Sequence, residues 1–240
     1  MEKPLLDLHN GLLLALPAPA LARLRPFLQS VELAAGTPLY ESGSSLRHVY
    51  FPIDAIVSLL CVIENGASAQ IAVVGHEGMV GIAVFMGGDS TRTRAVVQQA
   101  GHAWRLPGVR LKEEFDRHAE ALVLMLRYTQ SLVGQMAQTA VCNRHHSIDQ
   151  QLCRWLLQSL DRLPTAHLAM TQELIASLLG VRREGVAEAA GKLQRSGAIV
   201  YHRGHIEVLD RSLLERLCCE CYAVVKREEM RLLGGESLTP

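Results

Sequence analysis

Two adjacent charged residues are the best candidates for chemistry in this chain, because their side chains could read the edges of base pairs. Arg183 and Glu184 stand at the start of a run with helical spacing. An arginine can donate two hydrogen bonds to O6 and N7 of guanine, and a glutamate can accept one from N4 of cytosine. In the first turn of a recognition helix, such side chains reach the major groove of DNA. The pair therefore predicts a DNA-reading helix, with an ordinary helix carrying solvated charges as the alternative.

The surrounding sequence predicts the elements that would position this pair. Thr171 can cap the start of one helix, and Gly180 can end it in the left-handed conformation. A second helix is expected over residues 182–196, followed by β-rich runs at 199–201 and 206–208 that predict a hairpin. Two helices and a hairpin in this order are typical of a winged helix-turn-helix. We expect DNA contacts from Thr171, Gln172, Arg182, Arg183, Glu184, Ala187, Glu188, Lys192 and Arg203.

Three of the six cysteines form the tight group Cys218-Cys219-Glu220-Cys221. Thiolates in such a group could bind a metal ion or act as a redox switch. Zinc needs four ligands, and the other candidates are Cys142, Cys153 and the histidines of the hairpin. We favour free cysteines packed against the reading unit, so we expect no metal and no cofactor.

The composition is that of a globular protein, with 49% hydrophobic residues, 20% charged residues and a formal net charge of zero. A small basic excess lies in residues 143–207, which carry 8 basic and 6 acidic side chains. Residues 119–141 are the most apolar long stretch, but Arg127 and Gln135 interrupt them, and the N-terminus lacks the positive start of a signal peptide. We therefore expect a cytoplasmic protein with no membrane partner.

Periodicity divides the chain into three parts of an α+β protein. Residues 1–110 are expected to form a jelly-roll-like β-roll with N-terminal helices, because short β-rich runs alternate with glycines. Residues 111–143 are expected to form one long dimerisation helix, and 144–240 the winged helix-turn-helix domain, with a frayed charged tail from residue 224. The dimer interface is predicted from apolar positions at alternating spacings of 3 and 4: Leu122, Leu126, Thr129, Val133, Met136 and Ala140. The alternative is a helix that packs on its own domain.

This order of parts resembles the Crp/Fnr family of bacterial transcription regulators. The resemblance is carried by GTPLYESG (36–43), VGHEGMVGIAVFMGG (74–88), CNRHHSIDQQLCRWLL (142–157) and LLGVRREGVAEAAGKLQRSGAI (178–199). It implies a homodimer that binds a two-fold symmetric DNA operator and acts with RNA polymerase. It also places the base-reading glutamate of the family on Glu184. The position one turn later, often an arginine in the family, is Glu188 here, so the resemblance does not imply the family's half-site sequence.

The sensory half departs further from the family pattern. Where cyclic-nucleotide-binding members have a Gly-Glu pair, Gly81 is followed by Ile82, so the carboxylate that would bind the ribose is absent. Arg92 and Arg94 remain near the expected phosphate site as weak candidates for effector binding. We therefore expect that any small-molecule effector is not cyclic AMP. No cysteine precedes Cys61, so the N-terminal iron–sulfur site of oxygen sensors is not supported.

No catalytic constellation stands out, so the chain is not expected to be an enzyme. A cupin-like metal site would need a third ligand beside His48 and His76, which are 28 residues apart. The main alternative to a transcription regulator is a DNA-binding architectural or partner-binding module whose β-roll is purely structural.

Overall fold

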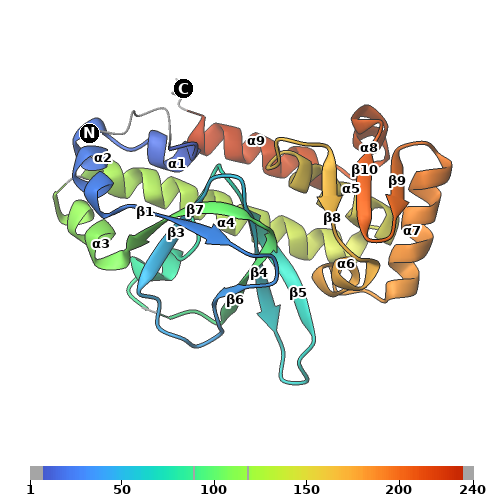
Figure 1. The fold of residues 1–240 in the computed structure, drawn as a ribbon, viewed down its shortest axis with the longest axis horizontal. Coiled ribbons are helices and arrows are strands. Elements are labelled where there is room, and N and C mark those ends of the chain that lie inside the picture. The colour runs from blue at the N-terminus through green and yellow to red at the C-terminus, as the bar shows by residue number, and fades with distance from the viewer. Residues whose placement is uncertain (1–7, 89, 118, 235–240) are drawn as a thin grey trace.

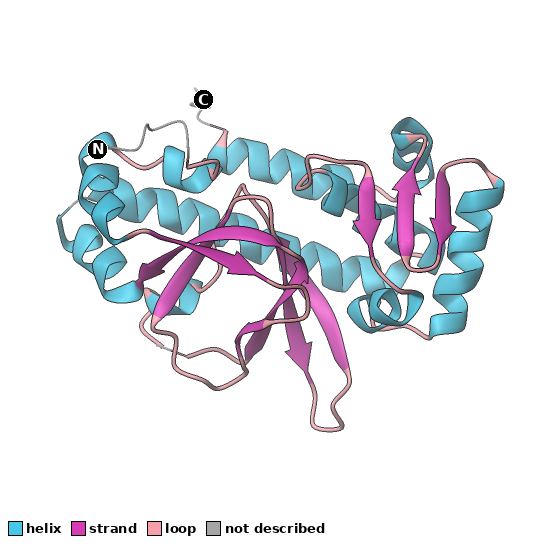
Figure 2. Cartoon of the chain, viewed as in Figure 1, coloured by secondary structure: helices cyan, strands magenta, loops and turns pink. Residues whose placement is uncertain are grey.

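The glycine-punctuated first half of the chain folds into a β-roll of two antiparallel sheets (Figures 1 and 2). The computed structural model describes residues 8–88, 90–117 and 119–234. One sheet has the strand order β1-β7-β3, and the other has the order β2-β6-β4-β5. The strands are β1 (Gln29–Leu33), β2 (Pro38–Tyr40), β3 (His48–Pro52), β4 (Ile56–Val62), β5 (Ser68–Val74), β6 (Thr93–Gln99) and β7 (Gly101–Pro107).

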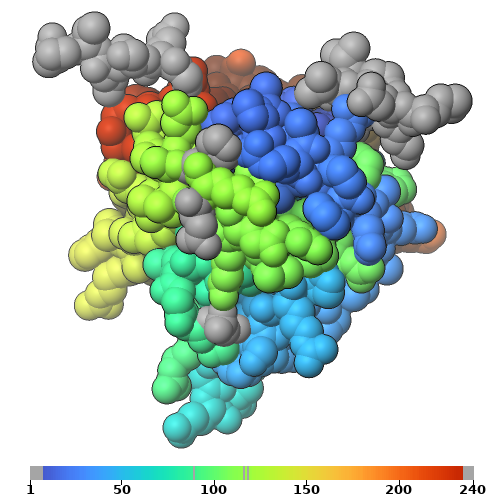
Figure 3. Space-filling view, turned by 90° about the vertical axis from the view of Figure 1, so that its left-hand side faces the viewer, coloured from blue at the N-terminus to red at the C-terminus, as the bar shows by residue number. Residues whose placement is uncertain are grey.

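Short helices close one end of the roll. They are α1 (Gly11–Leu14), α2 (Ala18–Leu24), the 3-10 turn η2 (Arg25–Phe27) and α3 (Gly108–Arg117). In the space-filling view, the N-terminal segment, in blue, lies beside green parts of the chain (Figure 3), and α2 contacts α3. Asn10 fixes α1 in place, because its side chain caps Leu13 and donates hydrogen bonds to the carbonyl oxygens of Pro52 and Gly78, each at 2.9 Å.

The long helix α4 (Ala119–His145) joins the β-roll to the C-terminal unit. Most of its buried residues are spaced 3 and 4 apart; the first part of this stripe packs on the roll, and its end packs against the C-terminal unit. Tyr128 donates from its hydroxyl to the Met79 carbonyl at 2.7 Å, and Gln135 accepts from the backbone N–H of Val73 at 2.6 Å. The stripe consists of Ala121, Met125, Tyr128, Leu132, Gln135, Thr139 and Cys142.

The C-terminal unit has its own hydrophobic core, which is built around Leu156, Ile175, Val186 and Ile206. A three-stranded sheet of order β8-β10-β9 packs beside its helices (Figure 2). Its elements are α5 (Ile148–Leu160), β8 (His167–Ala169), α6 (Gln172–Leu179), α7 (Arg183–Arg195), β9 (Ile199–His202), β10 (His205–Val208) and α8 (Arg211–Leu217).

The last described helix, α9 (Cys221–Leu233), runs back along α4 (Figure 1). The expectation of a frayed tail from residue 224 is wrong for the described part, because Val225 and Leu232 are buried on the α4 side of the chain. A buried ion-pair group lies beside this helix. The Arg162 guanidinium is 2.7 Å from Glu77 of the loop after β5 and 3.8 Å from Glu229 of α9, so it connects three parts of the fold.

The α+β fold with a β-roll, a long helix and a helix-turn-helix is confirmed, but some boundaries differ from the expectation. The helical region from residue 111 is divided into α3 and α4, which contact each other. The expected hinge at 143–146 lies further along, because α4 continues to His145 and Ser147 begins α5 with a capping box to Gln150. No helix of the described residues is long and apolar enough to cross a membrane.

Candidate nucleic-acid interface

The helix pair α6–α7 places Arg183 and Glu184 at an exposed helix start, as the sequence predicted. Thr171 caps α6 by accepting from the N–H of Leu174, and Gly180 ends α6 with a φ of 68°. No side chain caps α7, so the first N–H groups of that helix remain available to water or to a phosphate oxygen. Arg183 and Glu184 are both exposed in this first turn.

The wing presents Arg203 at the tip of a tight turn. Arg203 and Gly204 both have positive φ, 48° and 81°, which is the signature of a two-residue type I′ turn between β9 and β10. The turn is tied to the chain just before α6, because Met170 donates from its N–H to the Gly204 carbonyl at 2.6 Å. Tyr201 in turn donates to the Met170 carbonyl at 2.7 Å. The backbone at Arg203 is thereby held near the start of α6, and its side chain is exposed.

A concavity of about 470 Å³ lies between the wing tip and the N-terminal ends of α6 and α7. Two arginines and one acidic residue line it, and most of its wall is polar. Such a hollow, with positive side chains next to an uncapped helix start, suits a phosphate of a DNA strand. The lining residues are Thr171, Gln172, Glu173, Arg183, Tyr201, Arg203 and Gly204.

Further along α7, the positive charge is partly compensated within the chain. The Lys192 ammonium lies 3.0 Å from Asp149 of α5 and 3.1 Å from Glu188 one turn earlier on α7, and hydrogen bonds to these two carboxylates raise the pKa of Lys192. Ion pairs this exposed contribute little, so a DNA phosphate can compete for Lys192. Arg182 and Glu188 are exposed, whereas Ala187 and Gln172 are half-buried.

The weak effector candidates do not form a shared anion site. Arg94 is paired with Glu41, whose carboxylate is 3.0 Å from Nε, while Arg92 is exposed. Ile82, at the position of the missing carboxylate, packs against the hydrophobic core of the roll. The preceding Gly81 has a φ of 109°, and an added Cβ would lie 3.2 Å from the His48 carbonyl oxygen. The residue that follows Gly81 in this loop is therefore apolar and packs against the core of the roll.

A row of apolar residues is exposed on α4 outside its buried stripe. Leu126 and Val133 are each about half exposed, at 52% and 53%, and Ala140 continues the row. Of the other predicted interface residues, Leu122 and Met136 are half-buried. Thr129 is the exception: it is buried within its own chain and donates to the Met125 carbonyl at 2.9 Å. The predicted 3-and-4 series therefore included one residue of the buried face among the residues of the dimer interface. Val123, which the sequence analysis missed, is exposed on the outer face.

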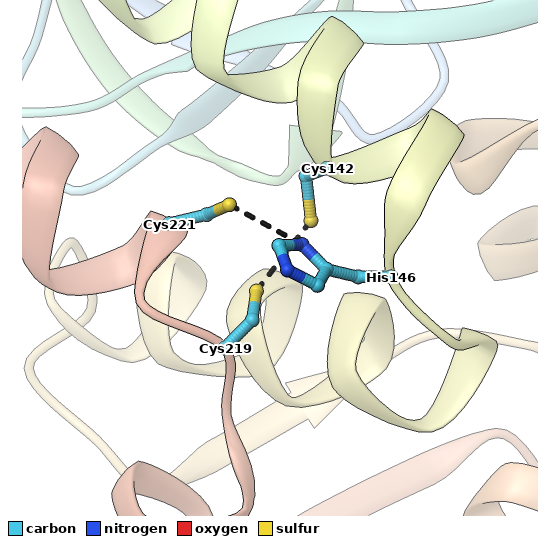
Figure 4. Close-up of side chains that lie close together, drawn as sticks. All are labelled: Cys142, His146, Cys219 and Cys221. Carbon is cyan, nitrogen blue, oxygen red and sulfur yellow. Dashed lines mark hydrogen bonds between the residues drawn. The ribbon is translucent and has the colours of Figure 1, made fainter.

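The structure brings Cys142, His146, Cys219 and Cys221 together where α4 ends and α9 begins (Figure 4). The Sγ atoms of Cys142 and Cys219 are 3.6 Å apart, and Sγ of Cys221 is 3.4 Å from Nδ1 of His146. Hydrogen bonds from the Cys142 and Cys218 thiols hold the pKa of Cys219 well below its usual value.

The sequence analysis named Cys142 and the Cys218–Cys221 group but missed His146 as their neighbour. Cys153 lies instead in the core of the C-terminal unit. The hairpin histidines His202 and His205 line a separate hollow on the wing sheet. Spacing alone gave no signal for His146, because α4 and α9 must pack together before the two segments meet.

Comparison with known protein families gives two matches that divide the chain as the fold does. Residues 30–118 match the cyclic nucleotide-binding domain, and residues 150–217 match the Crp-like helix-turn-helix domain. No curated protein sequence matches the chain.

Solved structures share the fold at low sequence identity. FixK2 from Bradyrhizobium japonicum superposes with a TM-score of 0.69 at 16% identity, over 80% of this chain and 98% of that one. A putative regulator of the Crp/Fnr family from Eubacterium rectale gives 0.67 at 17% identity, over 84% and 94% of the two chains. The c-di-GMP responsive regulator CLP from Xanthomonas campestris gives 0.63 at 15% identity, over 81% and 100%.

Proposed function

Since the chain belongs to the Crp/Fnr family of transcription regulators, we propose that it acts as a homodimer that binds a near-palindromic DNA operator through α7 and the wing. In this proposal α7 lies in the major groove. Arg183 and Glu184 contact base edges, and Arg203 contacts a phosphate. The protein would act in the cytoplasm together with RNA polymerase.

The observation that carries the proposal is the arrangement of side chains around the concavity between α6, α7 and the wing. Arg183 and Arg203 line it from two different elements, and the start of α7 next to it has no side-chain cap. The wing turn is tied to the chain before α6 by a backbone hydrogen bond and by the Tyr201 hydroxyl, so the backbone that carries Arg203 is in place before DNA binds. Such preorganisation lowers the entropy cost of binding.

The dimer is supported by the exposed apolar row on α4. Its members Val123, Leu126 and Val133 are separated by 3 and 7 residues, which keeps them on one side of the helix, and Ala140 continues the row seven residues later. A second copy of α4 would cover this row and place two reading units side by side. Two such units would address half-sites about one helical turn of DNA apart.

We propose that the effector, if the chain has one, is not cyclic AMP. Ile82 occupies the position of the ribose-binding carboxylate and Arg94 is already paired with Glu41. The Xanthomonas protein of the same fold is described as responsive to c-di-GMP, which shows that this fold serves effectors other than cyclic AMP.

The test is selection of bound DNA from a random pool, followed by affinity measurements on the selected site. We expect a near-palindrome with half-sites ~10 base pairs apart, centre to centre. Arg183→Ala and Glu184→Ala should each relax one base position, at a cost of about 1–3 kcal/mol. Arg203→Ala should weaken all sequences alike and lower the salt slope by about one unit.

The matched control is Arg47→Ala, which removes an exposed arginine from the β-roll. It should leave both the selected sequence and the affinity unchanged. Selection of a sequence without two-fold symmetry would refute the dimeric reading mode. Identical specificity profiles for Arg183→Ala and Arg203→Ala would refute the assigned orientation of α7.

A DNA-binding module with a purely structural β-roll is the second candidate function. Two observations favour it: Arg94 is paired with Glu41, and the partly buried Ile82 offers no hydrogen-bond acceptor in its loop. A ligand that changes DNA affinity would decide for a regulator and against this alternative.

A further inference from the structure

Four potential metal ligands converge on one point from two segments that are distant in the sequence. Cys142 and His146 lie one turn apart at the C-terminal end of α4, and Cys219 and Cys221 lie just before and at the start of α9. The three cysteines are buried, and the His146 side chain is only 17% exposed. One atom from each of the four side chains lies within 4.8 Å of all the others.

The distances suit a single tetrahedral ion. Zinc binds thiolate sulfur at about 2.3 Å and imidazole nitrogen at about 2.0–2.1 Å, so neighbouring ligand atoms of a tetrahedral site are about 3.5–3.8 Å apart. The Sγ–Sγ separation of 3.6 Å between Cys142 and Cys219 and the Sγ–Nδ1 separation of 3.4 Å between Cys221 and His146 lie close to these values. A disulfide would need the two sulfur atoms about 2.05 Å apart, so the sulfurs are not bonded to each other.

We propose that Cys142, His146, Cys219 and Cys221 form a structural zinc site that fastens the end of the long helix to the start of α9. Four protein ligands of the Cys₃His type fill the coordination sphere, which is the pattern of structural rather than catalytic zinc. The inference does not depend on the proposed DNA function, because it concerns only these four side chains and the elements that carry them.

The residues around the four ligands support this assignment. The second ring nitrogen of His146, Nε2, is 3.4 Å from the Glu220 carboxylate, and a carboxylate partner of this kind orients a metal-binding histidine. Gln138 donates from its side-chain amide to Sγ of Cys221 at 3.0 Å, as expected beside a thiolate. Three thiolates and one Zn²⁺ leave a net charge of −1, and the positive guanidinium of the buried Arg154 lies in the same region, bonded to Thr139 of α4.

The position of the site in the fold gives the ion a mechanical role. His146 directly precedes Ser147, the N-cap of α5, where the proposed DNA-reading unit begins. An ion held by both α4 and the loop before α9 would fix this junction and limit rotation of the reading unit against the long helix.

A polynuclear iron–sulfur cluster is the main competing occupant. Its ligands surround several iron and sulfide atoms and are usually four thiolates. Here the four ligand atoms lie within 4.8 Å of one another, and one of them is an imidazole nitrogen, so a single ion is favoured.

The experiment uses the full-length chain, purified with reductant and without chelator. We expect about one zinc per chain by elemental analysis, and replacement by Co²⁺ should give thiolate-to-metal charge transfer and the visible bands of tetrahedral cobalt. Cys219→Ser, Cys221→Ser and His146→Ala should each lower the metal affinity at least about tenfold. Cys61→Ser, in the exposed part of β4, and Cys153→Ser, in the C-terminal core, are the matched controls and should keep it.

Because a ligand variant could fail to fold, the wild-type chain supplies a second measurement. Removal of the ion with a chelator should lower the midpoint of thermal unfolding, and added zinc should restore it. The proposal is overturned by fully reduced thiols with no stoichiometric zinc, by iron with acid-labile sulfide in place of zinc, by octahedral cobalt bands, or by equal loss of metal in the two control variants.

Discussion

Glu229 should make the stability of this protein depend on pH in a way that a single substitution removes. Its carboxyl group lies on α9, largely buried beside Arg162. Burial and the like charge of Glu77 raise the pKa of Glu229 to about 7, although the Arg162 guanidinium at 3.8 Å opposes the rise. A carboxyl group with a raised pKa binds its proton more tightly in the folded chain than in the unfolded chain. The stability that it contributes is therefore fully present below about pH 4.5 and is lost as the pH rises through about 7.

The size of the effect follows from the displacement of this pKa. A rise from 4.5 to about 7 corresponds to about 3 kcal/mol, because one unit of pKa is worth ~1.4 kcal/mol. Glu229→Gln keeps the shape of the side chain and removes the charge. The free energy of unfolding of the variant, measured relative to wild type, should therefore increase by up to about 3 kcal/mol between pH 4.5 and pH 8.

The assay is urea unfolding at several pH values, with protein concentration, ionic strength, zinc and reductant held constant. Glu228→Gln is the matched control, because Glu228 is the neighbouring residue on α9 and its exposed carboxylate pairs with Arg231. The ion pair with Arg231 lowers the pKa of Glu228. The stability that the Glu228 carboxylate contributes is therefore lost only as the pH falls toward this lowered pKa, below the range of the assay. If the difference in the free energy of unfolding between Glu229→Gln and wild type stays constant from pH 4.5 to pH 8, the reasoning is refuted.

Three further predictions concern the dimer, the packing of α4 and the effector. In the proposed dimer, Leu126→Glu would bury a charge in an apolar interface, so sedimentation should show monomers and a dissociation constant raised at least about 100-fold. Leu209→Glu, also at an exposed position, should leave the proposed dimer intact. Gly78→Ala should lower the free energy of unfolding by about 1–3 kcal/mol, because the new Cβ would lie 2.6 Å from the buried Tyr128 ring. Gly88→Ala is the control: its new Cβ would make only ordinary contacts, so the free energy of unfolding should stay unchanged. Calorimetry should show no micromolar binding of cyclic AMP, and tight binding that strengthens the DNA complex would contradict the role given to Ile82.

The parts of the fold that were predicted from sequence depend on local chemistry. Thr171 and Gly180 mark the two ends of α6 because a side-chain cap and a left-handed residue act within a few positions. The Arg203-Gly204 turn is equally local, since both residues adopt positive φ in a two-residue hairpin. For the same reason, the alternation of short β-rich runs with glycines in residues 1–110 was enough to predict a β-roll.

The parts that were missed depend on contacts between distant segments. Strand β8 has only three residues and is defined by its pairing with β10, which no short window of sequence reveals. The sequence of α9 is rich in charged residues, which suggested a frayed tail. Its apolar positions are buried because the helix packs along α4, and that contact cannot be read from the α9 sequence alone. The group of Cys142 and Cys219 joins positions 77 residues apart, so its geometry follows from that helix packing and not from cysteine spacing.

The two faces of α4 restrict the lengths that this helix can have. Its inner stripe, which includes Tyr128 and Leu132, and its outer row, which includes Leu126 and Val133, follow the same 3-and-4 repeat on two different faces. An α-helix turns by about 100° per residue, so inserting one residue near residue 130 would rotate everything beyond it out of both contacts. An insertion of seven residues would nearly restore the rotation, to within about 20°, but would move the reading unit about 10 Å along the helix axis. Insertions and deletions in this helix should therefore be tolerated far less than substitutions, because the same helix sets the packing of the chain and, in the proposed dimer, the interface with the second copy and the distance between the two DNA-reading heads.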